Sequence, residues 1–395
     1  MIAGGGIVVL ILYLLYERLL IAKRIQCIPL RICVTGTRGK SSVTRLIFSS
    51  LKEAGFNVLA KTTGSKPVII FPDGSEKEIK RHGNPTLLEE KHILNTAIDL
   101  HVQAIVLELM SINPESIFIE SVKMVKPNIL IITNVRLDHL AQMGKSKEVI
   151  ANCFASAIPE KSTVVICQEE FFPAFIKISE ERDSKLVQIP RDYLDEFADF
   201  GKMFPSFEFE QNIRLSLAVT DYLGIERETA LAGIKSVCED FGGLRAWEDE
   251  NILSGRKWVF VSAFAANDPE STKDVLLRIK RNGVTERKKI IGILNLRSDR
   301  GDRTLQWMEA LKQGNFPDFD KLILIGKHGA VLKKKLRSLQ GTELYALNKK
   351  NPEGIVASLR EIEKEDAVIV GIGNMAGAGE ALVKYWEKTG RNYDI

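Results

Sequence analysis

Short runs of apolar residues recur along the chain and alternate with segments whose apolar positions follow helical spacing. These runs lie at 32–34, 104–107, 128–133, 163–167, 258–261, 290–294, 321–325 and 367–370. A continuous apolar run between amphipathic helices is typical of a parallel strand covered on both faces. The pattern therefore predicts an α/β fold with parallel sheets. A Pro-Asp-Gly turn at 72–74 after an apolar segment predicts an antiparallel hairpin added to the first sheet.

The N-terminus has a different pattern. Residues 2–16 carry no charge, Glu17 and Arg18 follow, and Lys23-Arg24 come after a second apolar stretch. If the two central charges lie at the interface, the segment approaches the roughly 20 apolar residues of a membrane span. The basic residues after it place the rest of the chain in the cytoplasm. We expect a single-pass transmembrane anchor helix at residues 1–24 in the cell membrane; the alternative is a buried core helix.

A glycine pair within Phe-Gly-Gly-Leu-Arg at 241–245 is the best candidate for a domain joint, because a new strand-rich series follows it. This predicts a central P-loop-type domain at 25–245 and a smaller C-terminal α/β domain at 246–395. A Gly-rich stretch at 371–379 follows the last apolar run but lacks the dinucleotide spacing. It predicts a tight turn rather than a second cofactor site.

The composition excludes only a few classes of function. The 395 residues are 45% apolar and 27% charged, which are ordinary globular values. A net charge of +4 is too weak for this length to indicate nucleic-acid binding. The 5 cysteines are scattered and form no C-x-x-C motif, which is typical of a reducing compartment and argues against a thiolate metal cluster.

The most specific chemistry lies between the strand at 32–34 and the helix that follows it. The turn reads Gly36, Thr37, Arg38, Gly39, Lys40, Ser41 and Ser42. A Gly-rich turn that opens a helix directs backbone N–H groups and the positive end of the helix dipole at an anion. A lysine followed by a hydroxyl residue supplies a cation for the outer phosphates of a nucleotide and an oxygen for Mg²⁺. The turn predicts phosphate binding although Val34 replaces the first glycine of the full P-loop pattern.

Two further strand ends carry polar residues. Glu108 follows the run at 104–107, and Asp138-His139 follow the run at 128–133. Ligands of open α/β sheets bind at the carboxyl ends of the strands, where these residues are expected. Because Mg²⁺ prefers oxygen ligands, Ser41 and Glu108 are natural candidates, and His139 is a less preferred one.

Taken in order, these motifs resemble the Mur ligase superfamily, which are ATP-dependent amide ligases. The resemblance covers nearly everything from residue 31 onward, including Thr133-Asn134, Arg245 after the glycine pair and an Asn267-Asp268-Pro269 turn. Within the superfamily the sequence is most similar to the ligase subunits of bacterial poly-γ-glutamate (capsule) synthases. The N-terminal apolar segment, the stretch at 71–89 and the turn at 263–269 favour this branch.

The resemblance implies roles for individual residues. Lys40, Glu108 and His139 form the catalytic set: Lys40 holds the β- and γ-phosphates, and His139 binds a second Mg²⁺. Ser41 and Glu108 bind the Mg²⁺ of ATP. The remaining nucleotide contacts are the rest of the turn at 36–42, Asn212, Arg245, Asn267 and Asp268, the last two brought in by closure of the second domain. The chain departs from the family pattern in having Ser41 for the usual threonine, no lysine at 150–158 and an altered turn at 267–269.

The function implied is an ATP- and Mg²⁺-dependent ligase that extends poly-γ-glutamate through an acyl phosphate. Its partners would be glutamate, the growing chain, the membrane and small integral-membrane export subunits, and no nucleic acid. Two alternatives remain open at this point. One is a cytosolic folylpolyglutamate- or Mur-type ligase, and the other is a non-catalytic nucleotide-binding component of a membrane complex.

Overall fold

The computed structural model describes residues 2–64, 66–81, 83, 85–195, 210–237, 244–249, 255–299, 301–314, 319–336, 341–349 and 351–393. The chain divides into two compact units. Unit 1 comprises Met1–Phe204 and Phe209–Cys238, and unit 2 comprises Pro205–Glu208 and Glu239–Ile395. The glycine pair of the predicted joint lies outside the described residues.

Unit 1 contains an eight-stranded sheet in the order β4-β3-β2-β5-β1-β6-β7-β8. Its strands are β1 Leu30–Thr35, β2 Val58–Thr62, β3 Val68–Ile70, β4 Glu76–Glu78, β5 Ala104–Glu108, β6 Ile129–Ile132, β7 Thr163–Cys167 and β8 Lys185–Ile189. The six strands from β2 to β8 in this order are parallel, whereas β3 and β4 pair antiparallel at one edge. The predicted parallel sheet and its antiparallel hairpin are confirmed.

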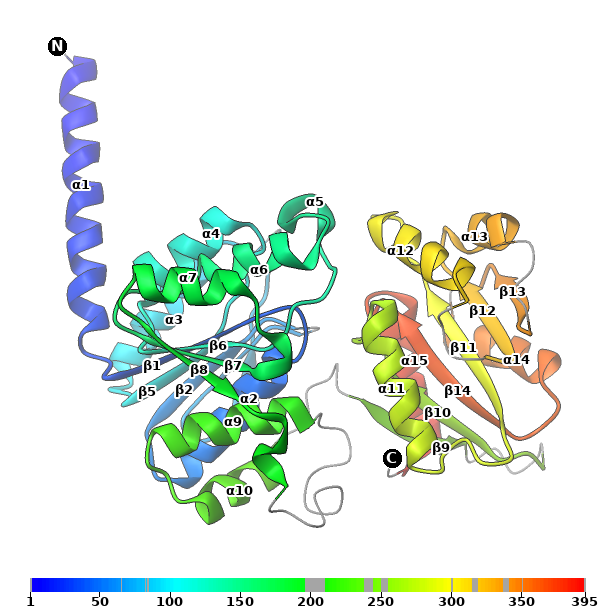
Figure 1. Cartoon of the computed structure of the whole chain (residues 1–395). Coiled ribbons are helices and arrows are strands. Elements are labelled where there is room, and N and C mark those ends of the chain that lie inside the picture. Colours follow the sequence, from blue (N-terminus) through cyan, green and yellow to red (C-terminus); the bar gives the residue numbers. More distant parts are fainter. Residues whose placement is uncertain are drawn as a thin grey trace. The chain divides into compact units, whose positions relative to one another are not determined.

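Helices cover both faces of this sheet (Figure 1). They are α2 Lys40–Glu53, α3 Leu88–Asp99, α4 Pro114–Phe118, the π-helical turn η1 Ile119–Val125, α5 Leu140–Met143, α6 Lys147–Ala155, the turn η2 Gln168–Glu170, α7 Pro173–Glu181, the turn η3 Arg191–Leu194, α9 Glu210–Tyr222 and α10 Arg227–Lys235. Residues from α3, α4, α6 and α7 pack in one core layer, and residues from α2 and α9 pack in the other. Successive strand residues alternate between the layers: Cys33 enters the first, and its neighbours Ile32 and Val34 enter the second.

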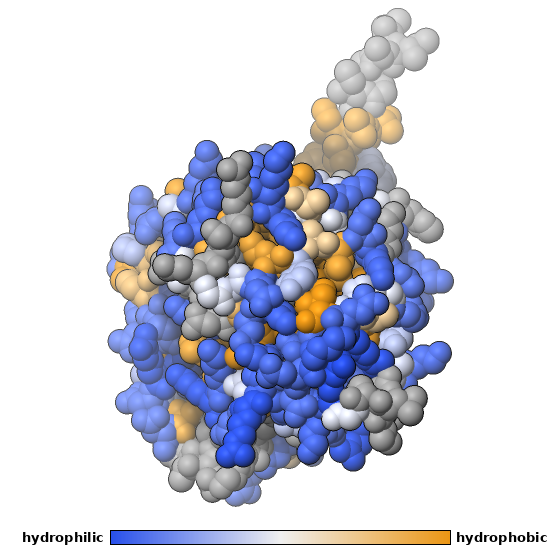
Figure 2. Space-filling view, turned by 90° about the vertical axis from the view of Figure 1, so that its right-hand side faces the viewer, coloured by the Kyte–Doolittle hydropathy of each residue, from blue (hydrophilic) through white to orange (hydrophobic). Residues whose placement is uncertain are grey.

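The N-terminal helix α1, Ile2–Ile25, projects from unit 1 (Figure 1). Residues 9–16 are exposed and apolar, so this part is not the buried core helix considered above; its described part stands out as hydrophobic at the top of Figure 2. The base of the helix is attached to α3, because Glu17 pairs with Lys91 and Arg24 Nη1 donates to Asn95 Oδ1 at 2.6 Å.

The predicted transmembrane helix at residues 1–24 is not supported. Among the described residues, no helix combines the length and the apolar character that a membrane crossing requires.

Unit 2 contains a seven-stranded sheet in the order β13-β12-β11-β14-β10-β9-β15. Its strands are β9 Arg245–Asp249, β10 Trp258–Ser262, β11 Lys289–Asn295, β12 Lys321–Ile325, β13 Glu343–Leu347, β14 Ala367–Gly373 and β15 Gly390–Tyr393. The strands from β13 to β10 are parallel, and β9 and β15 are antiparallel. Its helices are α11 Pro269–Arg281, α12 Gly301–Lys312, α13 Gly329–Leu336, α14 Pro352–Ile362 and α15 Ala378–Thr389.

A group of aromatic rings lies among aliphatic side chains in the core of unit 2, on the face covered by α14 and α15. Trp386 of α15 is fully buried and stacks on Phe260 with ring centroids 5.1 Å apart and on Phe264 at 5.9 Å. The close packing explains one glycine of the 371–379 stretch. A Cβ on Gly371 would lie 2.3 Å from the Phe264 ring, so only glycine fits there.

Candidate active site

The turn at 36–42 connects β1 to α2 and is closely packed on both sides. Gly36 has φ 123°, and a Cβ there would lie 2.2 Å from Thr133 Oγ1. Gly39 has φ 79°, and a Cβ there would lie 2.4 Å from Asn212 Oδ1. Both positions therefore require glycine for conformation and for space. The loop opens α2 at Lys40, so the free N–H groups of the first helical turn face the carboxyl edge of the sheet.

Lys40 folds back over this loop. Its Nζ donates a hydrogen bond to the Gly36 carbonyl oxygen at 2.9 Å. Burial lowers the pKa of Lys40, and the nearby Glu108 carboxylate opposes this by favouring the charged form. Because its hydrogen-bond acceptor is a neutral carbonyl, the ammonium charge is available to neutralise an anionic ligand. This is the property that a phosphate-binding lysine needs.

Ser41 and Glu108 lie together, as predicted from their places at the start of α2 and the end of β5. Ser41 Oγ donates to Glu108 Oε2 at 2.7 Å, and the Thr63 backbone N–H donates to the same oxygen at 2.6 Å. Glu108 is 3% exposed. A hydroxyl and a carboxylate oxygen side by side fit Mg²⁺, which usually takes one or two protein oxygens and fills its other positions with phosphate and water.

His139 lies at the other side of the loop, at the start of α5. It has φ 49°, and its backbone N–H donates to its neighbour Asp138 at 2.9 Å. The ring Nε2 is 3.8 Å from Asp138 Oδ2, and the same carboxylate pairs with Arg38 Nη1 at 3.1 Å. Asp138 therefore connects His139 to the phosphate loop. In the part of the chain that the structure describes, no three His, Cys, Asp or Glu side chains gather as a metal site, so the second Mg²⁺ at His139 stays a prediction.

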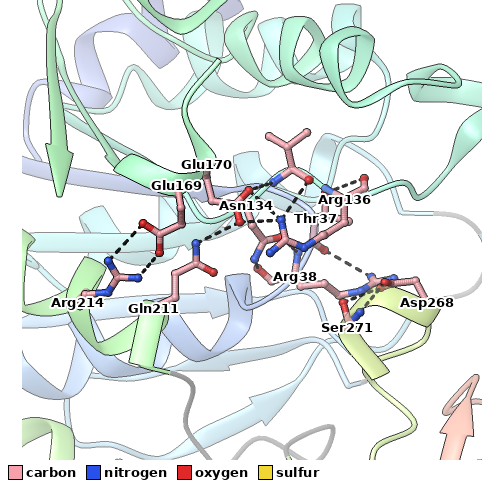
Figure 3. A network of polar contacts seen from close by, with 11 residues as sticks. Thr37, Arg38, Asn134, Arg136, Glu169, Glu170, Gln211, Arg214, Asp268 and Ser271 are labelled. Carbon is pink, nitrogen blue, oxygen red and sulfur yellow. Dashed lines mark hydrogen bonds and ion pairs between the residues drawn. The ribbon is translucent and has the colours of Figure 1, made fainter. Parts of the chain in front are cut away.

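A set of side chains braces the loop from both sides (Figure 3). We call it the loop-bracing network, and it consists of Thr37, Asn134, Arg136, Glu170 and Gln211. The Thr37 N–H donates to the Asn134 carbonyl at 3.0 Å, and Asn134 Oδ1 accepts the Arg38 N–H at 2.9 Å. The Arg136 N–H donates to Thr37 Oγ1 at 3.0 Å.

Arg136, Glu170 and Gln211 were not identified from the sequence. A usable signal was present, because Gln168-Glu169-Glu170 follows the strand β7 at the carboxyl edge where Glu108 and Asp138-His139 were sought.

The remaining predicted contacts of unit 1 are also placed by these elements. Asn212 belongs to α9, is 3% exposed and lies against Gly39. Ser42 is half-buried in the first turn of α2. The structure therefore brings Asn212 to the phosphate loop.

The predicted contacts in unit 2 have local partners there. Arg245 begins β9, where its Nη1 pairs with Glu387 at 3.1 Å and its guanidinium lies 5.1 Å from the centre of the Trp247 ring. Asp268 is the N-cap of α11 and accepts hydrogen bonds from the N–H and Oγ of Ser271 at 2.9 and 2.8 Å (Figure 3). Asn267 directly precedes this cap. A role of the three in nucleotide binding stays a prediction.

Comparison with known proteins matches both units to families. The profile described as Mur ligase middle domain matches residues 34–234, and the profile described as poly-gamma-glutamate synthase CapB C-terminal domain matches residues 250–389. The capsule biosynthesis protein CapB of Bacillus anthracis is 31% identical over 97% of this chain and 82% of its own length. The PGA synthase CapB of Bacillus subtilis (strain 168) is 33% identical over 92% of this chain and 91% of its own length.

Solved structures show the same fold at low identity. The structure of FolC from E. coli in complex with DHPP and ADP has a TM-score of 0.66 and 14% identity, covering 94% of this chain and 93% of that one. MurF from Acinetobacter baumannii has a TM-score of 0.63 and 14% identity, covering 92% and 79%. The chain therefore belongs to the CapB poly-γ-glutamate synthase family of the Mur ligase superfamily, whose members are ATP- and Mg²⁺-dependent ligases that form amide bonds.

Proposed function

We propose that this ligase extends poly-γ-glutamate by adding glutamate to the end of the growing polymer. Two lines of support exist. The relatives at 31% and 33% identity are described as a capsule biosynthesis protein and a PGA synthase. The observation that carries the chemistry is the Ser41 Oγ–Glu108 Oε2 contact of 2.7 Å beside Lys40 at the end of a Gly-rich loop.

The reaction follows from the poor reactivity of a carboxylate toward amines. The γ-phosphoryl group of ATP passes to the terminal γ-carboxylate of the polymer, which gives ADP and an acyl phosphate. The α-amino group of the incoming glutamate attacks this carbonyl, loses a proton, and releases phosphate as the amide forms. The protein's contribution to such transfers is alignment and charge neutralisation.

Within this proposal each group at the loop has a role. The N–H groups of the loop and the Lys40 ammonium hold the β- and γ-phosphates. Ser41 and Glu108 would hold Mg²⁺, which neutralises phosphate charge when bound. His139 is proposed as a ligand of a second Mg²⁺. Further nucleotide contacts are proposed for Asn212, Arg245, Asn267 and Asp268.

Membrane association is a separate part of the proposal. It is supported by the exposed apolar side chains of residues 9–16 in α1 and by Lys23-Arg24 at the end of the same helix. The enzyme would act at the cytoplasmic face of the cell membrane with integral-membrane export subunits. Fractionation of cells that express the full chain or a chain without residues 1–24 tests this. Recovery of both forms in the membrane-free fraction would remove it.

The ligase proposal is tested with radiolabelled glutamate, ATP and membranes that contain the partner subunits. We expect labelled polymer and one ADP for each glutamate added. Release of AMP would contradict the acyl-phosphate route. Nucleotide binding without any polymer, in a preparation whose partners are present, would instead favour the non-catalytic component. A parallel reaction with a folate acceptor in place of the polymer separates the folylpolyglutamate-type alternative.

A further inference from the structure

Glu170 occupies a central position in the loop-bracing network. It ends the turn η2 after β7, and it is 5% exposed. Its carboxylate pairs with the Arg136 guanidinium at 2.6 Å and accepts the Val135 backbone N–H at 3.1 Å. It also accepts a longer hydrogen bond, 3.4 Å, from Gln211 Nε2. A single buried carboxylate thus contacts the segment after β6 and the helix α9.

Both of these elements contact the phosphate loop directly. On one side, the backbone N–H of Arg136 binds Thr37, and Asn134 in the same segment binds both Thr37 and Arg38. On the other side, Gln211 precedes Asn212, whose side chain lies against Gly39. Figure 3 shows the contacts from the loop through Arg136 and Glu170 to Gln211 of α9. The proximity of Asn212 to Gly39 leads from α9 back to the loop.

We propose that Glu170 is a positioning residue for nucleotide binding: it fixes the segment 134–139 and α9 at the two sides of the phosphate loop. The inference rests on the proposed nucleotide site at 36–42. A loop that already has its binding conformation loses little conformational entropy when the phosphates bind, so its affinity for them is higher. If the brace is weakened and the competent loop falls to about a tenth of the population, the apparent affinity falls about tenfold.

The adjacent residue provides a matched control for a purely structural role. Glu169 pairs with Arg214 of α9, and Arg214 also donates to the Pro190 carbonyl. The two ion pairs are similarly buried, with side chains 16% and 6% exposed for Arg136–Glu170 and 5% and 17% for Arg214–Glu169. Within the described residues, Glu169 is bonded to Arg214 of α9 and not to the segment 134–139, so this pair holds α9 without linking it to that segment.

The experiment compares Mg·ADP binding by the full-length chain and the variants Glu170→Gln and Glu169→Gln, by isothermal titration. Urea unfolding of each variant is measured alongside. We expect both variants to lose stability, and only Glu170→Gln to raise the dissociation constant, by about tenfold. In a double-mutant cycle, adding Arg136→Gln to Glu170→Gln should weaken binding little further, because both changes break the same brace.

The outcomes separate this inference from the proposed function. Wild-type affinity in a folded Glu170→Gln variant would overturn the positioning role and leave the nucleotide site intact. An equal loss of affinity in Glu169→Gln would also overturn it, because attachment of α9 or general stability, and not the link through Glu170, would then explain the effect. If the wild-type chain does not bind Mg·ADP, the proposed function itself fails, and the positioning role fails with it.

Discussion

The two units have the same α/β architecture but use their polar side chains differently at the carboxyl ends of their parallel strands. In unit 2, Asn295 Nδ2 donates to the carbonyl oxygens of Asn374 and Ala376 at 2.6 and 3.1 Å, and Asn374 Nδ2 returns a bond to the Asn295 carbonyl at 3.0 Å. Arg303 Nη1 also donates to Asn374 Oδ1 at 2.8 Å. We call Asn295, Asn374 and Arg303 the amide group of unit 2. These side chains hold the turns of unit 2 to one another.

At the carboxyl ends of the strands in unit 1, the polar side chains include charged ones. Their contacts within the protein leave these charges able to bind a ligand. Lys40 donates to a neutral carbonyl, and Glu108 accepts bonds from a hydroxyl and an N–H. Among the described side chains, the charge that most favours the Lys40 ammonium is Glu108 of the same site. The comparison indicates that unit 1 is built to bind a charged ligand at this edge, whereas the amide group of unit 2 stabilises its own fold.

The largest effect that sharpens this comparison is expected from Lys40→Met. The substitution keeps the apolar stem and removes the charge that would stabilise the transferred phosphoryl group. We expect ATP-dependent ADP release to fall by about a hundred- to a thousandfold, a loss comparable to removal of one donor that stabilises transition-state charge. Lys333→Met, on an exposed residue of α13, is the control. Unchanged turnover in Lys40→Met would contradict the role given to the phosphate loop.

The parts of this site that could be predicted from sequence are those fixed by local pattern. The turn at 36–42 and Glu108 each follow an apolar strand, and parallel pairing necessarily brings such strand ends to one edge. That rule also correctly joined Ser41 to Glu108, although 67 positions separate them.

Side-chain partners across several elements could not be predicted in this way. The contact of Glu170 with Arg136 depends on the exact path of the segment after β6, and no periodicity records that path. At the N-terminus, hydropathy predicted the helix that the structure contains, but it could not predict the pairing of Glu17 with Lys91 of α3, because that contact is tertiary.

The largest effect on stability, as distinct from activity, is expected in the core of unit 2, from Trp386→Ala. The change would remove a fully buried indole that stacks on Phe260 and Phe264, and large-to-small changes of this kind cost about 3–5 kcal/mol. Urea unfolding would report the loss, and Mg·ADP affinity at the phosphate loop should persist while both units stay folded. Leu277→Ala, on a residue 42% exposed in α11, should change stability by about 0.5 kcal/mol or less. A comparable loss in both variants would contradict the packing argument.

A smaller effect is expected from Asn374→Ala in the amide group of unit 2. The substitution leaves the Arg303 guanidinium and the Asn295 carbonyl without their bonds to this side chain, at a cost of about 1–3 kcal/mol. Nucleotide affinity should stay within twofold, about 0.4 kcal/mol. Asn348→Ala, at an exposed position after β13, is the matched control. Tenfold weaker nucleotide binding in Asn374→Ala would show that this edge also serves the ligand, and the contrast between the units would not hold.

The most gradual effect is a pH dependence of Mg·ADP affinity. We expect it from Lys40 in unit 1 and not from the amide group of unit 2. Burial lowers the pKa of Lys40 below its ordinary value of 10.5, whereas bound phosphate favours the ammonium form and raises it. Between these two pKa values the complex holds one proton more than the free protein, so affinity falls as pH rises, by at most about tenfold per pH unit.

Titration of Mg·ADP binding from about pH 7 to about pH 10, in buffers of different ionisation enthalpy, measures this proton uptake directly. Lys40→Arg provides the decisive comparison, because a guanidinium stays charged over this range and should flatten the profile. The amide group of unit 2 carries no titrating lysine and cannot produce such a slope. Equal proton uptake by the wild type and Lys40→Arg would mean that another group titrates on binding. The assignment of the proton to Lys40 would then be wrong.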